Sequence, residues 1–111
     1  MADISPGDAI WVFLDPAIGR EQRGRRPAVV VSSRGHLHVA DTLAIVVPVT
    51  SVDRGWSNHI ALSTEVLDRQ SWAMTEQVRT ISRDRISGKA GRIDAATLAE
   101  IRGWIVDFID E

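Results

Sequence analysis

Hydrophobic and polar positions alternate with a period of two through most of the chain and change to a helical period only near its end. The clearest alternation is in the segment 7–14, GDAIWVFL, whose two faces hold Ile10, Val12 and Leu14, and Trp11 and Phe13. This pattern predicts a strand, which Asp15 and Pro16 end.

Four later segments have the composition of strands, with β-branched or alternating apolar residues between turn-forming sequences. They are PAVVVSS (27–33), LAIVVPVTS (43–51), SNHIALS (57–63) and WAMTEQVRTIS (72–82). Pro48 predicts a bulge or an edge in the second run, because proline has no amide hydrogen for a sheet ladder. The segments DPAIG, SSRGH, DRGWSN and SGKAG predict turns.

A C-terminal helix is predicted after Arg92, where the apolar period changes. Asp94 is the predicted N-cap, and apolar residues at helical spacing form one stripe: Leu98, Ile101, Ile105, Phe108 and Ile109. Five or more short strands followed by one helix predict a mainly β, α+β domain, built as a small, strongly curved antiparallel barrel or half-barrel.

Composition limits the number of domains and the chemistry of the chain. With 111 residues, 44% of them hydrophobic, residues 1–111 are expected to form a single domain. No apolar run approaches the length of a membrane span and no leader precedes the first strand, so a cytoplasmic protein without a membrane partner is expected. The absence of cysteine excludes disulfides, thiolate catalysis and thiolate zinc sites.

Basic residues are concentrated in the middle of the chain. Residues 20–92 hold 12 basic and 7 acidic side chains, while both flanking segments are acidic. The segment GREQRGRRPAVVVSS (19–33) places four arginines against one glutamate directly before a strand. Either this segment is a solvated hairpin tip, or an anion outside the chain offsets the repulsion between the arginines. The arginine fork suits phosphate.

Four blocks in order, GDAIWVFLDP, GREQRGRRPAVVVSS, VVPVTS and TEQVRTISRDRI, resemble the MazF/PemK family of toxin endoribonucleases from type II toxin-antitoxin systems. The resemblance spans nearly the whole chain. It implies an SH3-like barrel with a C-terminal helix, a homodimer, and a MazE-like antitoxin as partner. It also implies sequence-specific cleavage of single-stranded RNA that uses the ribose 2'-hydroxyl, needs no metal or cofactor, and inhibits translation and growth.

Cleavage of this type needs a proton acceptor, a proton donor and positive charge near the phosphorane, but no nucleophile from the protein. Arg26, in the RP block, matches a catalytic arginine of the family, and we assign it to charge stabilisation. Outside the family it would be an ordinary surface arginine beside a proline.

Thr50, in the block VVPVTS, matches a threonine that contacts the scissile region in the family. The resemblance implies that its hydroxyl orients the 2'-hydroxyl or donates to a phosphate oxygen, and Ser51 is expected to assist. Without the resemblance, a threonine after a strand most often only stabilises a turn.

The block TEQVRT supplies a candidate acid or base, Glu76, at a position where PemK-type members carry an aspartate. Gln77 and Arg79 match the family block and are expected to bind RNA, or else to hold a strand at the dimer or the loop. In a regular strand Glu76 shares a face with Val78 and Thr80, while Gln77 points the other way. Only a bulge would therefore bring both Glu76 and Gln77 into one site.

The first long loop is expected to cover an RNA groove, because its EQ pair matches the family and its arginines suit phosphates. The predicted RNA-binding residues are Arg20, Glu21, Gln22, Arg23, Arg25, Ser51, Trp56, Gln77 and Arg79. Trp56, in the polar loop DRGWSN, either stacks on an unpaired base or packs onto the barrel.

The three histidines carry weaker signals. His36 and His38, in a predicted loop with Asp41, have a spacing that could hold a metal, but a surface loop is the expected outcome and no metal site is predicted. His59 lies among apolar strand residues and is expected to pack there or to line the groove.

Two positions depart from the pattern of PemK-type members, some of which have histidine at position 20 and arginine at position 74. The chain has Arg20 and Met74 there. A histidine-dependent acid and base pair is therefore not expected at these positions. The mechanism is expected to depend on Arg26 and Thr50, as in the MazF-like branch.

Two other functions fit the same fold. A CcdB-like gyrase poison binds a protein and cuts nothing, but this function gives the EQ, RP and EQVRT blocks no role. A non-catalytic module that binds RNA or sequesters an antitoxin would be favoured by the loss of Arg26 or Thr50, and both residues are present.

Overall fold

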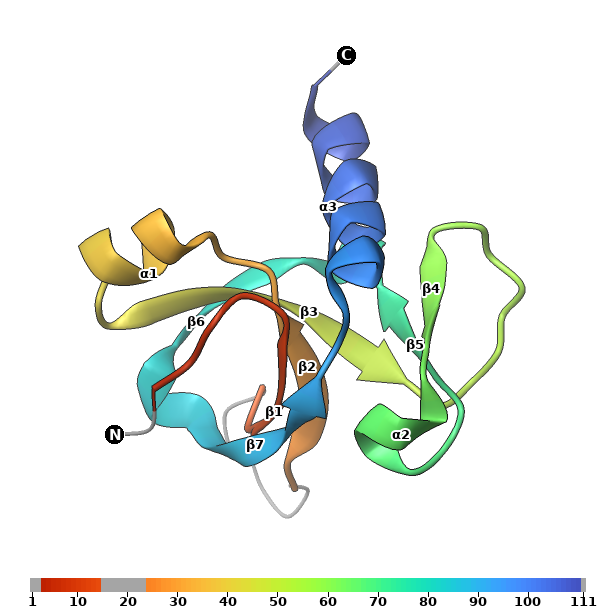
Figure 1. Ribbon diagram of the computed structural model, residues 1–111, viewed down its shortest axis with the longest axis horizontal. Helices are drawn as coiled ribbons and strands as arrows, with labels where there is room; N and C mark the ends of the chain where they lie inside the picture. Colours follow the sequence, from red (N-terminus) through yellow and green to blue (C-terminus); the bar gives the residue numbers. More distant parts are fainter. Residues whose placement is uncertain (1–2, 15–23, 111) are drawn as a thin grey trace.

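The computed structural model of the chain describes residues 3–14 and 24–110. Within these two ranges, seven strands form an antiparallel sheet with the order β4-β5-β3-β2-β1-β7, and β6 also pairs with β3. The strands are β1 (Asp8–Val12), β2 (Arg26–Val30), β3 (Leu43–Thr50), β4 (His59–Leu62), β5 (Ser71–Met74), β6 (Arg79–Ser82) and β7 (Ile86–Arg92). Figure 1 shows the sheet curling round on itself, as predicted for a barrel-like fold, although no ladder within the described ranges closes it.

Among the described residues, three helices and two 3-10 turns connect and cover the strands. They are α1 (Arg34–Val39), α2 (Thr64–Leu67), α3 (Ala95–Ile109), η1 (Thr75–Gln77) and η2 (Arg83–Arg85). In Figure 1, α1 and α2 lie on opposite sides of the molecule, and α3 rises away from the sheet towards the C-terminus. In the part of the chain that the structure describes, no helix is long and apolar enough to cross a membrane.

Two apolar clusters pack on the two faces of the central strands, because successive residues of a strand point to opposite faces. The first, here named the Val12 cluster, contains Ile10, Val12, Leu14, Ala28, Val30, Leu37, Ala44, Val46 and Ile81. The second, the Val47 cluster, contains Ala9, Val29, Val31, Val47, Val49, Ile60, Leu62, Val66, Ala73, Ile93, Leu98 and Ile101. The alternation predicted for the first strand is confirmed, since Ile10 is fully buried whereas Trp11 is half-buried and Phe13 is exposed.

β3 is the central strand of the sheet. It pairs with β2 along one edge, and with β6 and then β5 along the other. On that second edge the β6 ladder stops at Val46 and the β5 ladder starts at Val49, with η1 between the two strands. The single strand predicted over 72–82 is therefore wrong. Pro48 lies at this gap, where its missing amide hydrogen removes no ladder hydrogen bond on that edge.

α1 is a helix where the segment SSRGH predicted a turn. Ser33 caps it, and its Oγ accepts a hydrogen bond from the His36 amide at 3.0 Å. A serine hydroxyl serves turns and helix N-caps alike, so the local sequence does not separate the two. The buried side chain of Leu37 joins the Val12 cluster and ties the helix to the sheet.

The first half of α3 is anchored to the sheet. Asp94 caps the helix as predicted, with its Oδ1 accepting from the Thr97 amide at 2.7 Å. Arg102 donates to the carbonyl oxygens of Val31 and Ser32, each at 3.0 Å. These contacts join the helix to the end of β2.

The second half of α3, residues 103–109, extends past the sheet (Figure 1), so the predicted apolar stripe is only partly buried. Phe108 and Ile109 are 50% and 77% exposed, and Val106 is also exposed. The rings of Trp104 and Phe108 lie side by side, with centroids 6.0 Å apart. This half of the helix therefore presents an apolar surface to solvent.

Candidate functional site

Arg26 and Thr50 lie at the same end of two neighbouring strands. β2 begins at Arg26 and β3 ends at Thr50. The ladder between them ends at the pair Ala28 and Pro48, two residues from Arg26 and two residues from Thr50. Residues that face each other across a ladder, and residues two apart on one strand, point to the same side of the sheet. The two predicted catalytic side chains therefore share one face at the open end of the Val12 cluster.

The Thr50 hydroxyl has a local hydrogen bond and retains a donor. Thr50 is half-buried, and its Oγ1 accepts from the Val52 amide at 3.1 Å. This contact uses one acceptor position of the hydroxyl and not its hydrogen, which a ribose or phosphate oxygen could accept. The hydroxyl thus stabilises the start of the following loop, and it can still serve the predicted role. Ser51, next to it, is exposed.

Arg79 shares the face of Thr50. It lies opposite Val46 in the β3–β6 ladder, and Val46 is four residues before Thr50 on the same strand. At about 3.3 Å per residue, the Thr50 and Arg79 backbones are roughly 13 Å apart along the strand. The exposed side chain of Arg79 thus adds a cation to the face that carries Thr50.

η1 decides how Glu76 and Gln77 are presented. Both residues lie on this 3-10 turn and both are exposed. The predicted alternation of Glu76 with Val78 and Thr80 on one strand face is wrong, because no strand runs through Glu76. A 3-10 turn between two separate strands, and not a bulge within one strand, leaves both side chains exposed beside the edge of β3.

Glu76 is held by two side chains from the loop and strand that follow β3. Its Oε1 accepts from Asn58 Nδ2 at 2.7 Å and lies 3.0 Å from His59 Nε2, while its Oε2 lies 3.1 Å from the same nitrogen. Burial alone would raise the pKa of Glu76, but hydrogen bonds from His59, its own backbone and Asn58, with the electrostatic effect of His59, lower the pKa below its usual value. A carboxyl group held ionised has no proton to give, which disfavours the predicted role as an acid.

Buried polar groups support the Glu76 contact. Thr75 is fully buried, and its hydroxyl donates to the Asn58 carbonyl at 2.8 Å and accepts from Asn58 Nδ2 at 3.2 Å. The His59 side chain is only 2% exposed, as expected for a packed residue. Sequence reasoning did not identify Asn58 or Thr75, because residues 17 or 18 positions apart in a turn and a strand carry no shared local pattern.

Trp56 is 51% exposed, and its ring packs against the ring of His59. The two ring centroids are 4.8 Å apart and the ring planes meet at 50°. The Arg54 guanidinium lies 5.9 Å from the centroid of the indole on the same loop. An exposed indole supported from behind is suited to stacking on an unpaired base.

Arg25 and Arg26 point to opposite faces of the sheet. The Arg25 guanidinium lies 5.0 Å from the centroid of the Trp11 ring, on the side away from Val12. Arg26 faces Val12 directly. The structure thus does not bring Arg25 to the face of Arg26 and Thr50. The predicted RNA-binding residues Arg20, Glu21, Gln22 and Arg23 lie outside the described residues.

His36 and His38 lie on α1 and not in the predicted loop. The His36 ring nitrogen Nδ1 is 2.9 Å from the Ser32 hydroxyl, which also accepts from the Ile45 amide at 2.7 Å. Within residues 3–14 and 24–110, no group of three His, Cys, Asp or Glu side chains is placed to hold a metal ion.

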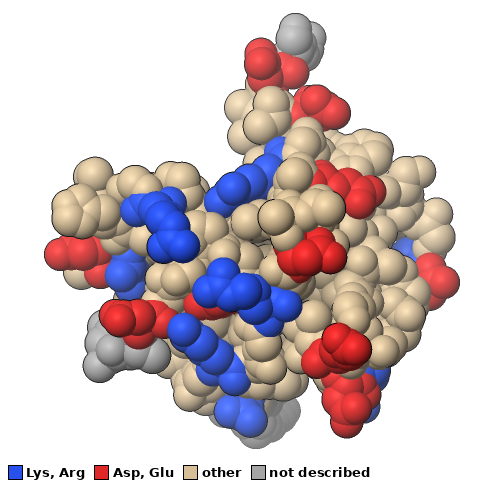
Figure 2. All heavy atoms as spheres, in the orientation of Figure 1, with Lys and Arg blue, Asp and Glu red and all other residues tan. Residues whose placement is uncertain are grey.

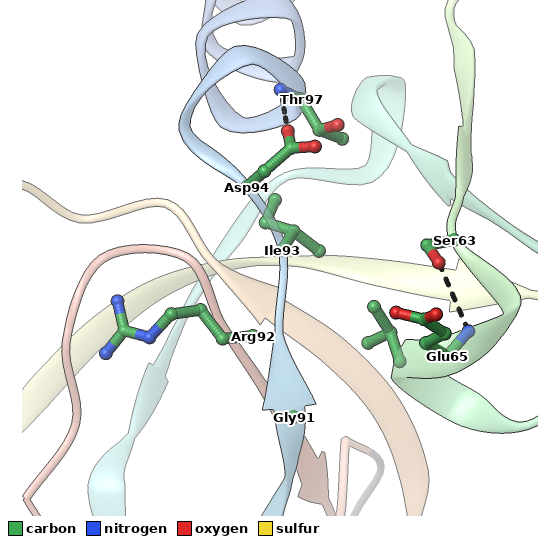
Figure 3. A pocket seen from close by; sticks show the side chains of 8 residues that line it. Ser63, Glu65, Gly91, Arg92, Ile93, Asp94 and Thr97 are labelled. Carbon is green, nitrogen blue, oxygen red and sulfur yellow. Dashed lines mark hydrogen bonds between the residues drawn. The ribbon is translucent and has the colours of Figure 1, made fainter.

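A pocket of about 370 Å³ lies between α2 and the start of α3. Figure 3 shows Glu65 on one side of it and Asp94 near the helix, with Arg92 extending away from Glu65. Two carboxylates in the lining would repel a phosphate, and none of the predicted site residues lines the pocket. This pocket is therefore not the predicted RNA site.

Lys and Arg side chains form a band across the face shown in Figure 2, from the region of α1 towards the lower part of the sheet, while acidic side chains lie near the end of α3, on the right side of this face and at its left edge. Part of the basic charge is neutralised within the fold. Lys89 and Arg92 pair with the buried carboxylate of Asp8 at 3.3 and 3.0 Å. These two residues serve the packing of β1 against β7.

Comparison with known proteins gives a consistent match. Residues 5–109 match the family described as PemK-like, MazF-like toxin of type II toxin-antitoxin system. Endoribonuclease toxin MazF of Escherichia coli (strain K12) is 35% identical over 100 residues, covering 89% of this chain and 87% of that protein. Endoribonuclease MazF9 of Mycobacterium tuberculosis is 40% identical over 100 residues, covering 83% and 85%. The crystal structure of MazE-MazF (Form-II) from Deinococcus radiodurans superposes with a TM-score of 0.82 at 28% identity, covering 96% of this chain and 95% of that chain.

Proposed function

The chain belongs to the PemK-like, MazF-like toxins of type II toxin-antitoxin systems, and we propose that it is a sequence-specific endoribonuclease that cleaves single-stranded RNA without a metal ion. The relatives named as endoribonucleases support the reaction. The observation that supports the proposal for this chain is that Arg26 and Thr50 lie at the same end of the neighbouring strands β2 and β3, each two residues beyond the pair Ala28 and Pro48. Such cleavage would stop translation and growth, and it would act on RNA in the cytoplasm.

The reaction we propose is an internal transfer within the RNA. The ribose 2'-oxygen bonds to the adjacent phosphorus and loses its proton, while the bond from phosphorus to the 5'-oxygen breaks and that oxygen gains a proton. The products are a 2',3'-cyclic phosphate and a 5'-hydroxyl. Arg26 stabilises the negative charge of the phosphorane, and Thr50 donates its hydroxyl hydrogen to a phosphate oxygen or orients the 2'-hydroxyl. The protein supplies no nucleophile.

The RNA strand would cross the face that carries Arg26, Thr50 and Arg79. Gln77 and Ser51 are exposed beside that path, and Trp56 offers a stacking surface on the neighbouring loop. Electrostatic attraction to phosphates would dominate the affinity, so binding depends strongly on salt. Arg25, on the other face of the sheet, would contact RNA only outside the catalytic groove.

We also propose that the protein acts as a homodimer through the exposed half of α3. Three apolar side chains of this half are exposed: Val106, Phe108 and Ile109. Their exposure to water is unfavourable in a monomer, and a contact with a second copy would bury them. Phe108→Lys is expected to shift the protein from dimer to monomer in sedimentation analysis, while Val39→Lys, on the exposed face of α1, leaves the dimer intact. A Phe108→Lys protein that sediments as a dimer would contradict this assignment.

The antitoxin partner we propose is MazE-like. The crystal structure from Deinococcus radiodurans is a MazE-MazF complex, and this chain superposes on it over nearly its full length. An acidic and apolar antitoxin segment would fit the exposed cations Arg26 and Arg79 and the exposed indole of Trp56. Such a segment and RNA would compete for the same face, which gives inhibition its physical basis.

The proposed activity is tested by incubating the purified protein with a long single-stranded RNA in the presence of EDTA, beside Arg26→Ala and Thr50→Ala. Arg34→Ala is the matched control, because Arg34 is an exposed arginine beyond the other end of β2. Cleavage by the wild type and the control, with a large loss in the two site variants, is expected. No cleavage by the wild type would favour the gyrase-poison function, to be checked in a supercoiling assay.

A further inference from the structure

The carboxylate of Glu76 has an acceptor position beyond those that the protein uses. A carboxylate offers about four lone-pair sites, two on each oxygen. Asn58 and His59 both contact Oε1, and His59 alone contacts Oε2 within the described residues. The Glu76 side chain is 29% exposed. The outward lone pair of Oε2 is thus open to a donor from outside the chain.

His59 holds the Glu76 carboxylate in one orientation, because its Nε2 contacts both carboxylate oxygens. An ionised carboxylate only accepts hydrogen bonds, so the His59 nitrogen Nε2 must be the donor. Its other nitrogen, Nδ1, is buried and has no hydrogen-bond partner in the part of the chain that the structure describes. A buried polar atom without a partner destabilises a fold, and an apolar side chain in this place would avoid that cost. The gain from the histidine is the fixed orientation of Glu76.

Trp56 lies next to the same histidine. Its ring centroid is 4.8 Å from that of His59, and Glu76 binds the edge of the same imidazole. The fixed carboxylate and the exposed indole are thus both in contact with one ring. A base stacked on the indole would have its polar edge beside the carboxylate.

The site around Glu76 shares a face with Thr50 but is separated from it. Thr50 pairs with Trp72, Trp72 pairs with Ala61, and His59 is two residues from Ala61 on the same strand. Two strand spacings of about 4.8 Å and a rise of two residues place His59 roughly 12 Å from Thr50. On the proposed path of the RNA, a base near His59 and Glu76 would therefore belong to another nucleotide than the one whose phosphate lies at Thr50.

We propose that Glu76 is a specificity-determining residue, which accepts a hydrogen bond from the amino group of an RNA base stacked on Trp56. Adenine, cytosine and guanine carry an exocyclic amino group. Uracil has a single N–H between two carbonyl oxygens, which a carboxylate repels. This inference rests on the proposed RNA cleavage, and it assigns Glu76 to base recognition and not to proton transfer.

The test is to cut a pool of RNA with randomised sequence and to count the bases around every cut. At one position near the cut, the wild type is expected to disfavour uracil about tenfold or more. This is the factor in affinity that one hydrogen bond to a charged acceptor contributes. In Glu76→Gln, the amide oxygen is expected to take the place of Oε1, which accepts from Asn58 and His59, so an NH₂ group replaces Oε2 and the second contact with His59 Nε2 is lost. The preference at that position is then expected to shift towards uracil, whose carbonyl oxygens accept from NH₂.

Two further variants keep the test independent of folding. Glu65→Gln removes a carboxylate on α2 outside the network and is expected to keep the wild-type preference. Trp56→Ala removes the stacking surface, so it is expected to weaken RNA binding and to abolish the preference at the same position among the cuts that remain. Unchanged base counts in both Glu76→Gln and Trp56→Ala would overturn the proposal. Loss of all cleavage in a folded Glu76→Gln protein would also overturn it, because the residue would then serve catalysis.

Binding of single-stranded DNA separates this inference from the proposed function. Oligomers of dA, dC and dT lack the 2'-hydroxyl and cannot be cut by the proposed reaction, while thymine has the same hydrogen-bonding edge as uracil. Tighter binding of the dA or dC oligomer than of the dT oligomer, lost in Glu76→Gln, would support base recognition even if no RNA were cut. Equal binding of all three by the wild type would count against it.

Discussion

Arg26 lies directly opposite Val12 in the β1–β2 ladder, at the point where the buried face of both strands reaches the open end of the sheet. The backbone of Arg26 is therefore fixed by the ladder, while its side chain is exposed. A cation on a fixed backbone needs little rearrangement to meet a developing negative charge. This relationship is the structural basis for assigning Arg26 to the phosphorane.

Replacement of Arg26 by alanine is expected to lower the cleavage rate by about 10² to 10³, the loss seen when one preorganised donor is removed from an active site. Arg26→Lys keeps the charge but lacks the planar fork, so its cleavage rate should lie between those of the wild type and Arg26→Ala. Initial rates on a labelled RNA measure both effects. Because Arg26 is exposed, both variants should melt at the temperature of the wild type. An Arg26→Ala protein as active as the wild type would be inconsistent with the assignment of Arg26 to the phosphorane.

Thr50→Ser and Thr50→Val separate the hydroxyl from the shape of the side chain. The serine variant keeps the donor and should cleave at a rate close to that of the wild type. The valine variant should lose about tenfold or more, as expected for a lost hydrogen bond to a charged group. Its Val52 amide also loses its acceptor, so melting temperatures are compared in parallel. Equal rates for the two variants would show that the hydroxyl has no part in the reaction.

Arg79→Ala should reduce the salt dependence of RNA binding. For single strands, each phosphate contact contributes about 0.7 to the slope of log K against log salt, so the slope should become shallower by about that amount. Fluorescence anisotropy with an RNA carrying 2'-deoxyribose at the cleavage site measures the slope without turnover. Arg34→Ala should leave it unchanged. An identical slope for Arg79→Ala would mean that this arginine does not contact a phosphate.

The cap of α3 should make stability depend on acid. Hydrogen bonds from the Thr97 side chain and backbone lower the pKa of Asp94 below its ordinary value of 3.8. A lowered pKa in the folded state gives stability above the ordinary pKa, which is lost as the pH falls through the folded value. Asp94→Asn keeps an acceptor but has no charge to titrate. Between about pH 6 and about pH 3, urea unfolding should show a smaller loss of stability for Asp94→Asn than for the wild type, and equal losses would argue against the cap.

Local patterns predicted the first strands and the last helix because their causes are local, whereas the turn predicted at SGKAG (87–91) is wrong, since this segment lies within β7. The alternation of segment 7–14 and the Asp94 cap involve residues within a few positions of one another, and both were confirmed. The family blocks likewise predicted the fold and the family. The helix α1 was not predicted, since Ser33 begins a turn or a helix equally well and only the burial of Leu37 decides between them.

The features that escaped prediction depend on contacts across the fold. η1 divides the predicted strand 72–82 into two strands. Along one edge of β3, the first part pairs with β6 and the last part pairs with β5, and Pro48 lies between the two ladders. The opposite directions of Arg25 and Arg26 follow from the register against Trp11 and Val12. The contact of His59 with Glu76 joins positions 17 residues apart. No pattern within a single segment contains these pairings.

The most direct measurement of the central claim is the chemistry of the cut ends. RNA cleaved by the purified protein in EDTA would be analysed by mass spectrometry, beside the Arg26→Ala and Thr50→Ala variants. Fragments ending in a 2',3'-cyclic phosphate, with 5'-hydroxyl partners, are expected from the wild type and only at trace level from the two variants. Fragments ending in a 3'-hydroxyl with 5'-phosphate partners, or activity that disappears with EDTA, would contradict cleavage by the 2'-hydroxyl at Arg26 and Thr50.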